Sequence, residues 1–122
     1  MIERRAGKLL FIASLWSFQG GNQVSAYTVT KSGIAGLVRG LSNEWAPKGL
    51  QVNGLAPGYI DTPLTNDLLR DPTRAPGLLS RIPSGRFGRP FDLPGAALFL
   101  SSPHSDYLTG TVLPVDGGWL AA

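Results

Sequence analysis

Tyr27 and Lys31 are the residues whose types and spacing most directly suggest chemistry in this chain of 122 residues. They lie four positions apart in the segment SAYTVTKSG, so on a helix both side chains project from one face, about one turn apart. A nearby ammonium favours the phenolate form of a tyrosine, which lets the phenol exchange a proton with a ligand near neutral pH. The same spacing also occurs by chance on amphipathic helices, so the surrounding elements must decide between a catalytic pair and a surface pair.

A long helix is predicted from about Ser25 to Ala46, because apolar residues recur there at helical spacing. Ser25 is a suitable N-cap, and Pro47 and Gly49 mark the end of the helix. The recurring apolar residues are Ile34, Leu37, Val38, Leu41 and Trp45. The helix also contains Gly33, Gly36 and Gly40. These glycines gather near one face, which predicts close approach of another helix or another subunit.

The remaining segments predict an α/β fold. The apolar runs at residues 8–14 (KLLFIAS) and 50–56 (LQVNGLA) indicate strands covered on both faces, as in a parallel sheet. Residues 91–102 return to helical spacing, and residues 110–119 supply a last strand with a Gly-rich end. Between them, residues 59–90 form an irregular connection broken by prolines, which is typical of a lid or binding loop.

Three strands leave one edge of a parallel sheet with unpaired backbone groups. The first strand also begins without a preceding helix to cover one of its faces. Both features predict that the chain is half of a larger fold.

Ligands of open parallel sheets bind at the carboxyl ends of the strands. Ser14, Tyr27 and the Pro57–Gly58 turn are therefore expected to meet in one crevice.

Four sequence elements in this order resemble the carboxyl-terminal half of a short-chain dehydrogenase/reductase. They are Ser14 thirteen positions before Tyr27, the run YTVTK, the run NGLAPGYIDT, and VDGG near the end of the chain. A lone Y-x-x-x-K is a weak signal, but the four together are specific and the resemblance covers essentially the whole chain. It implies half of a Rossmann-like, doubly wound parallel sheet and an NAD(P)-dependent oxidoreductase.

The resemblance also implies roles for individual residues. Tyr27 would be the general acid or base, Lys31 would favour its phenolate form and hold the nicotinamide ribose, and Ser14 would hold the substrate oxygen. Contacts with NAD or NADP would come from Tyr27, Lys31, Pro57, Gly58, Ile60 and Thr62, with Ile60 acting through its backbone. The implied assembly is a homodimer or homotetramer in which the long helix forms part of an interface.

The substrate implied by the resemblance is a sugar acid such as 2-deoxy-D-gluconate. Trp16 and Gln19 follow Ser14 and could line the sugar-acid pocket, or Trp16 could simply cover the edge of the core. Arg81, Arg86 and Arg89 could meet the substrate carboxylate, or they could be exposed loop residues.

Several family features are missing from this sequence. The phosphate-binding turn T-G-x-x-x-G-x-G, the residue that selects NAD or NADP, the N-N-A-G segment and the asparagine of the catalytic tetrad are all absent. We therefore expect residues 1–122 to be a catalytic half with three of four catalytic residues and residues 59–90 as its lid. The alternative is a catalytically silent fragment that acts as an oligomerisation or interaction module.

Other classes of function are disfavoured. The net charge is +3, but the basic residues are scattered, so nucleic-acid binding is not indicated. No apolar run is long enough for a membrane helix. The absence of cysteine excludes disulfides and is compatible with the expected cytoplasmic location. His104, the single histidine, lies in PHSD, but no G-x-S-x-G elbow accompanies it, and we expect neither a hydrolase triad nor a metal site.

Overall fold

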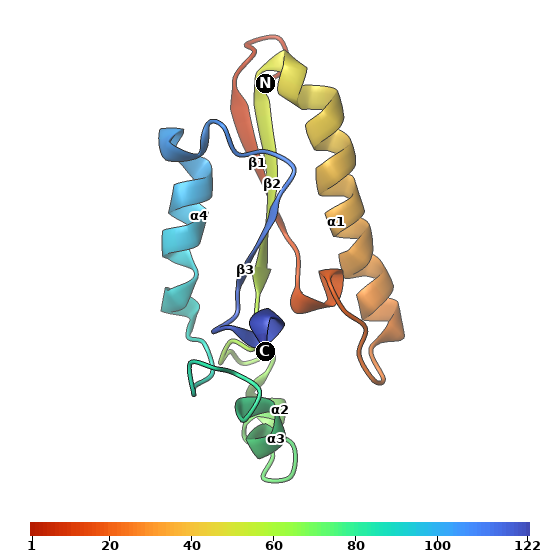
Figure 1. Cartoon of the computed structure of the whole chain (residues 1–122), viewed down its shortest axis with the longest axis vertical. Helices are drawn as coiled ribbons and strands as arrows, with labels where there is room; N and C mark the ends of the chain where they lie inside the picture. Colours follow the sequence, from red (N-terminus) through yellow and green to blue (C-terminus); the bar gives the residue numbers. More distant parts are fainter.

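The computed structural model describes residues 1–122 as a parallel sheet lying between two helices (Figure 1). The strands are β1 (Gly7–Ile12), β2 (Leu50–Pro57) and β3 (Val112–Val115). The helices are α1 (Ser25–Trp45), α2 (Asn66–Leu69), α3 (Ala75–Leu79) and α4 (Pro94–Ser101). Two 3₁₀ turns matter for the site, η1 (Leu15–Ser17) and η5 (Trp119–Ala121). The predicted α/β class is confirmed.

The sheet has the order β1-β2-β3, and both strand pairs are parallel. The central strand β2 is mostly buried, as its apolar run predicts. The prediction that the first strand is covered on both faces is wrong for this structure, because no residue of β1 is fully buried and Ile12 is 55% exposed. The reason is that α1 packs chiefly against β2, so one face of β1 is only thinly covered.

Helix α1 matches the predicted helix to within one residue, and its buried strip runs through Ala35, Val38 and Ser42. Ser25 is not the N-cap. Val24 occupies that position, because its carbonyl already accepts a hydrogen bond from the Thr28 N–H at 2.8 Å. Contrary to the apolar pattern, Leu37 is 43% exposed, because it turns towards the face that carries the glycines.

The glycine face of α1 has no partner within the chain. A Cβ atom built on any of its three glycines would meet no atom within 4 Å. Val29, which is 72% exposed, adds an uncovered apolar side chain to this helix. Close approach by another subunit therefore stays a prediction.

The carboxyl ends of β2 and β3 lie very close together. A Cβ on Gly58 would be 2.6 Å from Cα of Asp116, so only glycine fits there without a shift of the backbone. Asp116 then caps the last turn, since its carboxylate accepts the N–H groups of Gly118 and Leu120 at 2.9 and 3.0 Å. Gly118 has a φ of 93°, a conformation that suits glycine.

The connection at residues 59–90 is less irregular than predicted, because it contains the short helices α2 and α3. Its ends are joined by a bridge in which the Gly88 N–H donates to Tyr59 and the Asp61 N–H donates to Gly88. Ile82 from this connection packs with Leu15 in a small core beyond the sheet. In Figure 1, α2 and α3 lie beyond the carboxyl ends of the strands. None of the helices combines the length and apolar character needed to cross a membrane.

Candidate active site

A cavity of about 300 Å³ at the carboxyl ends of β1 and β2 brings together all the residues predicted to act in catalysis and cofactor binding. These are Ser14, Tyr27, Lys31, Pro57, Gly58, Ile60 and Thr62. The cavity wall also contains Ile12, Ala13, Thr65, Pro90 and Leu93, which the sequence did not suggest as site residues. Residues from three separate segments thus converge as the strand-end rule predicts.

Ser14 is positioned by the turn that follows β1. It is 8% exposed and caps η1, where its Oγ accepts the Trp16 N–H at 3.4 Å. Ser17 completes the turn, because its Oγ accepts the Ser14 N–H at 3.3 Å and donates to the Lys31 carbonyl at 2.6 Å. A second bond, from Ser32 Oγ to the Trp16 carbonyl at 3.1 Å, joins the same two elements. The turn that carries Ser14 is therefore fastened to the helix that carries Tyr27 and Lys31.

Tyr27 and Lys31 face the same cavity from the first turns of α1. The Lys31 Nζ lies 5.6 Å from the centre of the Tyr27 ring and donates to the Ile12 carbonyl at 2.9 Å. Tyr27 is 47% exposed, and its hydroxyl makes no hydrogen bond within the chain. The ammonium is thus anchored to the end of β1 beside a phenol that is free to contact a ligand.

Thr65 organises the turn that follows β2. Its Oγ1 donates to the Ile60 carbonyl and accepts the Thr62 N–H at 3.0 Å. These bonds fix the backbone that lines the cavity opposite Tyr27. The sequence reasoning missed Thr65, although a threonine three positions after Thr62 is a pattern typical of a hydroxyl-capped turn.

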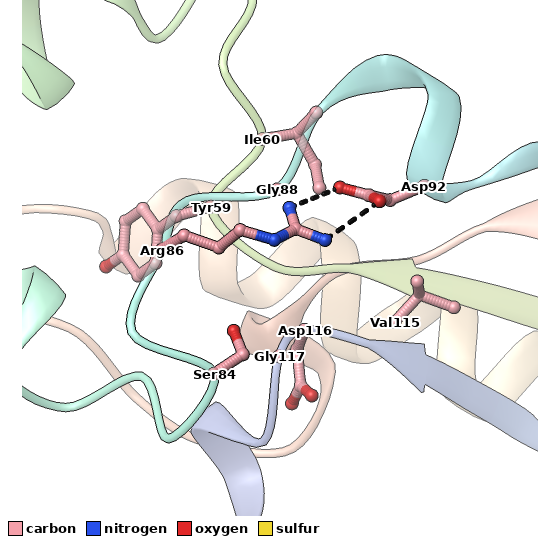
Figure 2. Close-up of a pocket in the computed structure, with 9 residues that line it drawn as sticks. All are labelled: Tyr59, Ile60, Ser84, Arg86, Gly88, Asp92, Val115, Asp116 and Gly117. Atoms are coloured by element: carbon pink, nitrogen blue, oxygen red, sulfur yellow. Dashed lines mark hydrogen bonds and ion pairs between the residues drawn. The ribbon is translucent and has the colours of Figure 1, made fainter.

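Arg86 is committed to an ion pair in a second cavity, of about 280 Å³, next to the first (Figure 2). Its guanidinium donates to both carboxylate oxygens of Asp92, at 2.7 and 3.0 Å. The hydrogen bonds from Arg86 are the main reason that the pKa of Asp92 falls to about 2. Asp92 also accepts the backbone N–H of Arg89 at 2.6 Å. Arg86 therefore braces the loop before α4 and is not free to hold a substrate carboxylate.

Trp16 and Gln19 line a third cavity, of about 440 Å³, rather than the one that contains Tyr27. The two cavities adjoin, because Ser14 and Ile60 line one while their near neighbours Trp16 and Tyr59 line the other. Arg81 belongs to this third cavity, and so does Arg74, which the sequence analysis did not single out. Arg89 lines none of the three cavities.

Comparison with known proteins identifies the family. Residues 1–120 match the family model described as enoyl-(acyl carrier protein) reductase. This chain belongs to the short-chain dehydrogenase/reductase family. Members of the family are NAD(P)-dependent oxidoreductases. The resemblance deduced from Ser14, the YTVTK run and the VDGG ending is thereby confirmed at the level of the family.

Two curated members of the short-chain dehydrogenase/reductase family illustrate the similarity. The chain is 51% identical to the 2-dehydro-3-deoxy-D-gluconate 5-dehydrogenase of Bacillus subtilis, over 99% of this chain and 48% of that protein. It is 43% identical to the 5-keto-D-gluconate 5-reductase of Escherichia coli, over 100% of this chain and 48% of that protein. The chain thus spans about half the length of the curated relatives it matches.

Solved structures of short-chain dehydrogenase/reductases share the fold. A gluconate 5-dehydrogenase from Burkholderia cenocepacia, in complex with NADP and tartrate, superposes with a TM-score of 0.96 and 40% identity, over 99% of this chain and 48% of that one. The second structure is a protein from Agrobacterium tumefaciens solved with NADP and provisionally assigned as a 2-deoxy-D-gluconate 3-dehydrogenase. It superposes with a TM-score of 0.96 and 52% identity, over 99% of this chain and 50% of that one.

The relatives are named for two different positions of oxidation. Within the family, the sequence resembles 2-deoxy-D-gluconate 3-dehydrogenase first and gluconate 5-dehydrogenase second. The two curated relatives above are named for carbon 5, and the Agrobacterium protein is named for carbon 3. Both names describe sugar-acid dehydrogenases. The similarity therefore supports the substrate class more strongly than the oxidised carbon.

Proposed function

We propose that this chain is the catalytic half of an NAD(P)-dependent dehydrogenase that interconverts a secondary alcohol and a ketone at carbon 5 of a gluconate-type sugar acid. The observation that carries the proposal is the convergence of Ser14, Tyr27 and Lys31 with the turn after β2 in one cavity. The names of the curated relatives support the sugar acid and carbon 5. The tartrate bound to the Burkholderia enzyme, itself a hydroxy acid, is in keeping with this class of substrate.

The residues of the cavity fit proton transfer to or from a substrate oxygen. In the reducing direction the Tyr27 hydroxyl donates its proton to the carbonyl oxygen, and in the oxidising direction the phenolate accepts the proton of the alcohol. Ser14 Oγ holds that oxygen beside Tyr27. The Lys31 Nζ, 5.6 Å from the centre of the Tyr27 ring, places a positive charge beside this residue.

The same cavity fits the nicotinamide end of the cofactor. The free hydroxyl of Tyr27 and the ammonium of Lys31 supply polar contacts on one side. The backbone of residues 57–62, fixed by Thr65, supplies the other side. When bound, the nicotinamide supplies or accepts the hydride at the reacting carbon. NADP in two related structures supports NADP as one cofactor, and NAD stays equally open.

Residues 59–90 act in this proposal as the lid over the substrate. Their ends are joined at the bridge between Ile60 and Gly88, so the segment between them is held at the mouth of the site. Its helices α2 and α3 lie beyond the carboxyl ends of the strands (Figure 1). The residues that line the active-site cavity follow the same strand ends. The cytoplasmic location expected from the sequence stays a prediction.

The glycine face of α1 supports a further element of the proposal, assembly as a homodimer or homotetramer. Glycines allow two helix backbones to approach closely, and this face has no partner within the chain. The same feature is the basis of the alternative function, an interaction module without activity. The two functions differ in whether the site turns over a substrate.

A hybrid enzyme tests the proposal. The chain is fused to the amino-terminal half of the Bacillus subtilis relative, to which it is 51% identical. We expect reduction of 5-keto-D-gluconate with NADPH or NADH, and oxidation of 2-dehydro-3-deoxy-D-gluconate at carbon 5 with NADP or NAD, both followed at 340 nm. Cofactor binding is measured separately by nucleotide fluorescence. A folded hybrid that binds NADPH but reduces no sugar acid would contradict the proposal and favour the interaction module.

A further inference from the structure

The third cavity contains two arginines without an acidic partner. Arg74 and Arg81 both line it, and no aspartate or glutamate does. The ion pairs of the chain are Lys8 with Asp106 and Arg86 with Asp92, so neither arginine of this cavity forms one. Asp71 lies close enough to Arg74 for the arginine charge to help lower its pKa, but Asp71 does not line the cavity. Two arginines on one concave surface without an acidic residue in its lining favour an anionic ligand.

Arg81 is exposed to solvent, but its guanidinium stacks on a fixed aromatic ring. Its guanidinium carbon lies 4.0 Å from the centre of the Trp119 ring. Trp119 is 2% exposed and belongs to the core cluster with Leu15 and Ile82, so the stacking surface is fixed. A stacked guanidinium keeps its N–H groups available at the ring edge for bidentate binding of a carboxylate. Arg81 is therefore preorganised for this kind of ligand.

The field of both arginines extends across the cavity to Tyr59. Burial raises the pKa of the Tyr59 hydroxyl, whereas the charges of Arg81 and Arg74 act to lower it. Tyr59 also packs edge-on against Trp119, with the ring centres 4.9 Å apart. Gln19 and Asn22 add neutral amide groups to the wall. The cavity thus combines a cationic end with groups that can bond to hydroxyls.

The third cavity lies next to the proton-transfer site. Trp16 lines the third cavity, and its backbone N–H donates to the Oγ of Ser14, which lines the first cavity. In a sugar acid the carboxylate is several bonds away from carbon 5. A binding site for the carboxylate must therefore lie beside the proton-transfer site and not within it.

We infer that Arg81, assisted by Arg74, binds the carboxylate of the sugar-acid substrate, an inference that rests on the proposed function. The structure thereby separates the three arginines that the sequence suggested. Arg86 is occupied by Asp92, Arg89 lies outside the cavities, and Arg81 is stacked and unpaired. Arg74 joins it from the amino-terminal end of α3.

Substitutions in the hybrid enzyme test the inference. Arg81→Gln and Arg74→Gln are compared with Arg39→Gln, which removes an exposed arginine of α1 outside these cavities. Loss of a charge-assisted bidentate contact is expected to raise KM for a 5-keto sugar acid about 10- to 100-fold, with little change in kcat. The neutral amide of the same acid should show no such change. Arg81→Lys keeps the positive charge but loses the bidentate guanidinium, so its KM should lie between those of the unmodified hybrid and Arg81→Gln.

Equilibrium binding provides a second readout that does not require turnover. Gluconate binding to the hybrid is followed by tryptophan fluorescence, because Trp16 and Trp119 line the cavity. We expect Kd for gluconate to rise about 10- to 100-fold in Arg81→Gln and to stay unchanged in Arg39→Gln.

The two proposals fail in different ways. If the unmodified hybrid binds gluconate through Arg81 but reduces no sugar acid, the proposed function fails and the carboxylate site stands. If the unmodified hybrid reduces the acid while Arg81→Gln and Arg74→Gln leave its KM within about twofold, or impair the acid and the amide equally, the carboxylate site is overturned. Retained turnover of the amide shows that a variant is folded.

Discussion

Backbone-directed hydrogen bonds of small hydroxyl side chains position the candidate catalytic residues. Ser17 connects the Ser14 turn to the Lys31 carbonyl, and Thr65 fixes the turn that carries Ile60 and Thr62. Lys31 itself forms no ion pair, and its Nζ donates to the Ile12 carbonyl at 2.9 Å. The geometry of the site therefore depends on residues that do not themselves contact the reacting atoms.

Thr65→Val should weaken cofactor binding. The substitution keeps the shape of the side chain but removes the hydroxyl that bonds to Ile60 and Thr62. Loss of two hydrogen bonds that order this turn is expected to raise Kd for NADPH about 5- to 30-fold, with a smaller effect on kcat. Nucleotide fluorescence in the hybrid enzyme measures the change. Thr65→Ser, which retains the hydroxyl, should behave like the unmodified protein; equal loss in both variants would contradict the role of the hydroxyl.

The Arg86–Asp92 pair predicts a pH-dependent contribution to stability. The pKa of Asp92 in the folded protein is about 2, below its ordinary value of 3.8, so the contribution is complete above pH 3.8 and is lost as the pH falls through about 2. We expect Asp92→Asn to lower Tm at about pH 6 and to have a much smaller effect at about pH 2. Thermal unfolding between these pH values measures the difference. Asp67→Asn, at an exposed position without an ion pair, should show little difference at any pH.

At the scale of elements, the site depends on how closely the carboxyl ends of the strands approach one another. The Pro57–Gly58 turn ends β2 beside Asp116, which follows β3. This contact sets the position of the backbone that leads into Ile60 and the cavity. Gly58 is therefore required for packing as well as for the proposed cofactor site.

Gly58→Ala should destabilise the fold. The added Cβ would lie 2.6 Å from Cα of Asp116, and relief of that overlap requires the two strand ends to separate. Overpacking of this kind costs about 1–3 kcal/mol of the free energy of unfolding. Urea denaturation measures it against Gly95→Ala in α4, where a Cβ meets nothing within 4 Å. Equal stability of both variants would show that the strand ends are not as close as described.

Much of this arrangement could be predicted from the sequence, because it depends on local pattern. Apolar runs located the strands, helical spacing located α1, and the strand-end rule brought Ser14, Tyr27 and Gly58 together. The contributions of Ser17 and Thr65 could not be predicted, because their bonds depend on the path of the backbone. The arginines could not be ranked either, since the partners Asp92 and Trp119 are brought to them only by the tertiary fold.

At the scale of the whole molecule, the open edge of β1 and the uncovered face of α1 are two unpartnered surfaces. The apolar run of β1 is typical of a strand covered on both faces, yet no residue of β1 is buried. A further strand at this edge, from the cofactor-binding half of the proposed enzyme, would account for that run. The glycines of α1 in turn are suited to contact with another subunit.

Gly36→Leu should disrupt assembly without destabilising the chain. The substitution places a large side chain on an uncovered helix face where no atom lies within 4 Å, and leucine favours a helix more than glycine does. We expect the hybrid enzyme to change from a dimer or tetramer to a smaller species in light scattering coupled to gel filtration. Its Tm at equal assembly state should not fall. An unchanged molar mass would rule out this face as the interface.

The proton-transfer role of Tyr27 is the central claim, and a comparison of two tyrosine variants in the hybrid enzyme tests it most directly. Tyr27→Phe removes only the hydroxyl that is free in the cavity, whereas Tyr107→Phe removes one that is fully exposed to solvent. We predict that Tyr27→Phe lowers kcat for sugar-acid reduction about 100- to 10,000-fold while NADPH binding is retained, and that Tyr107→Phe changes nothing. A Tyr27→Phe enzyme that keeps most of its kcat would contradict the account.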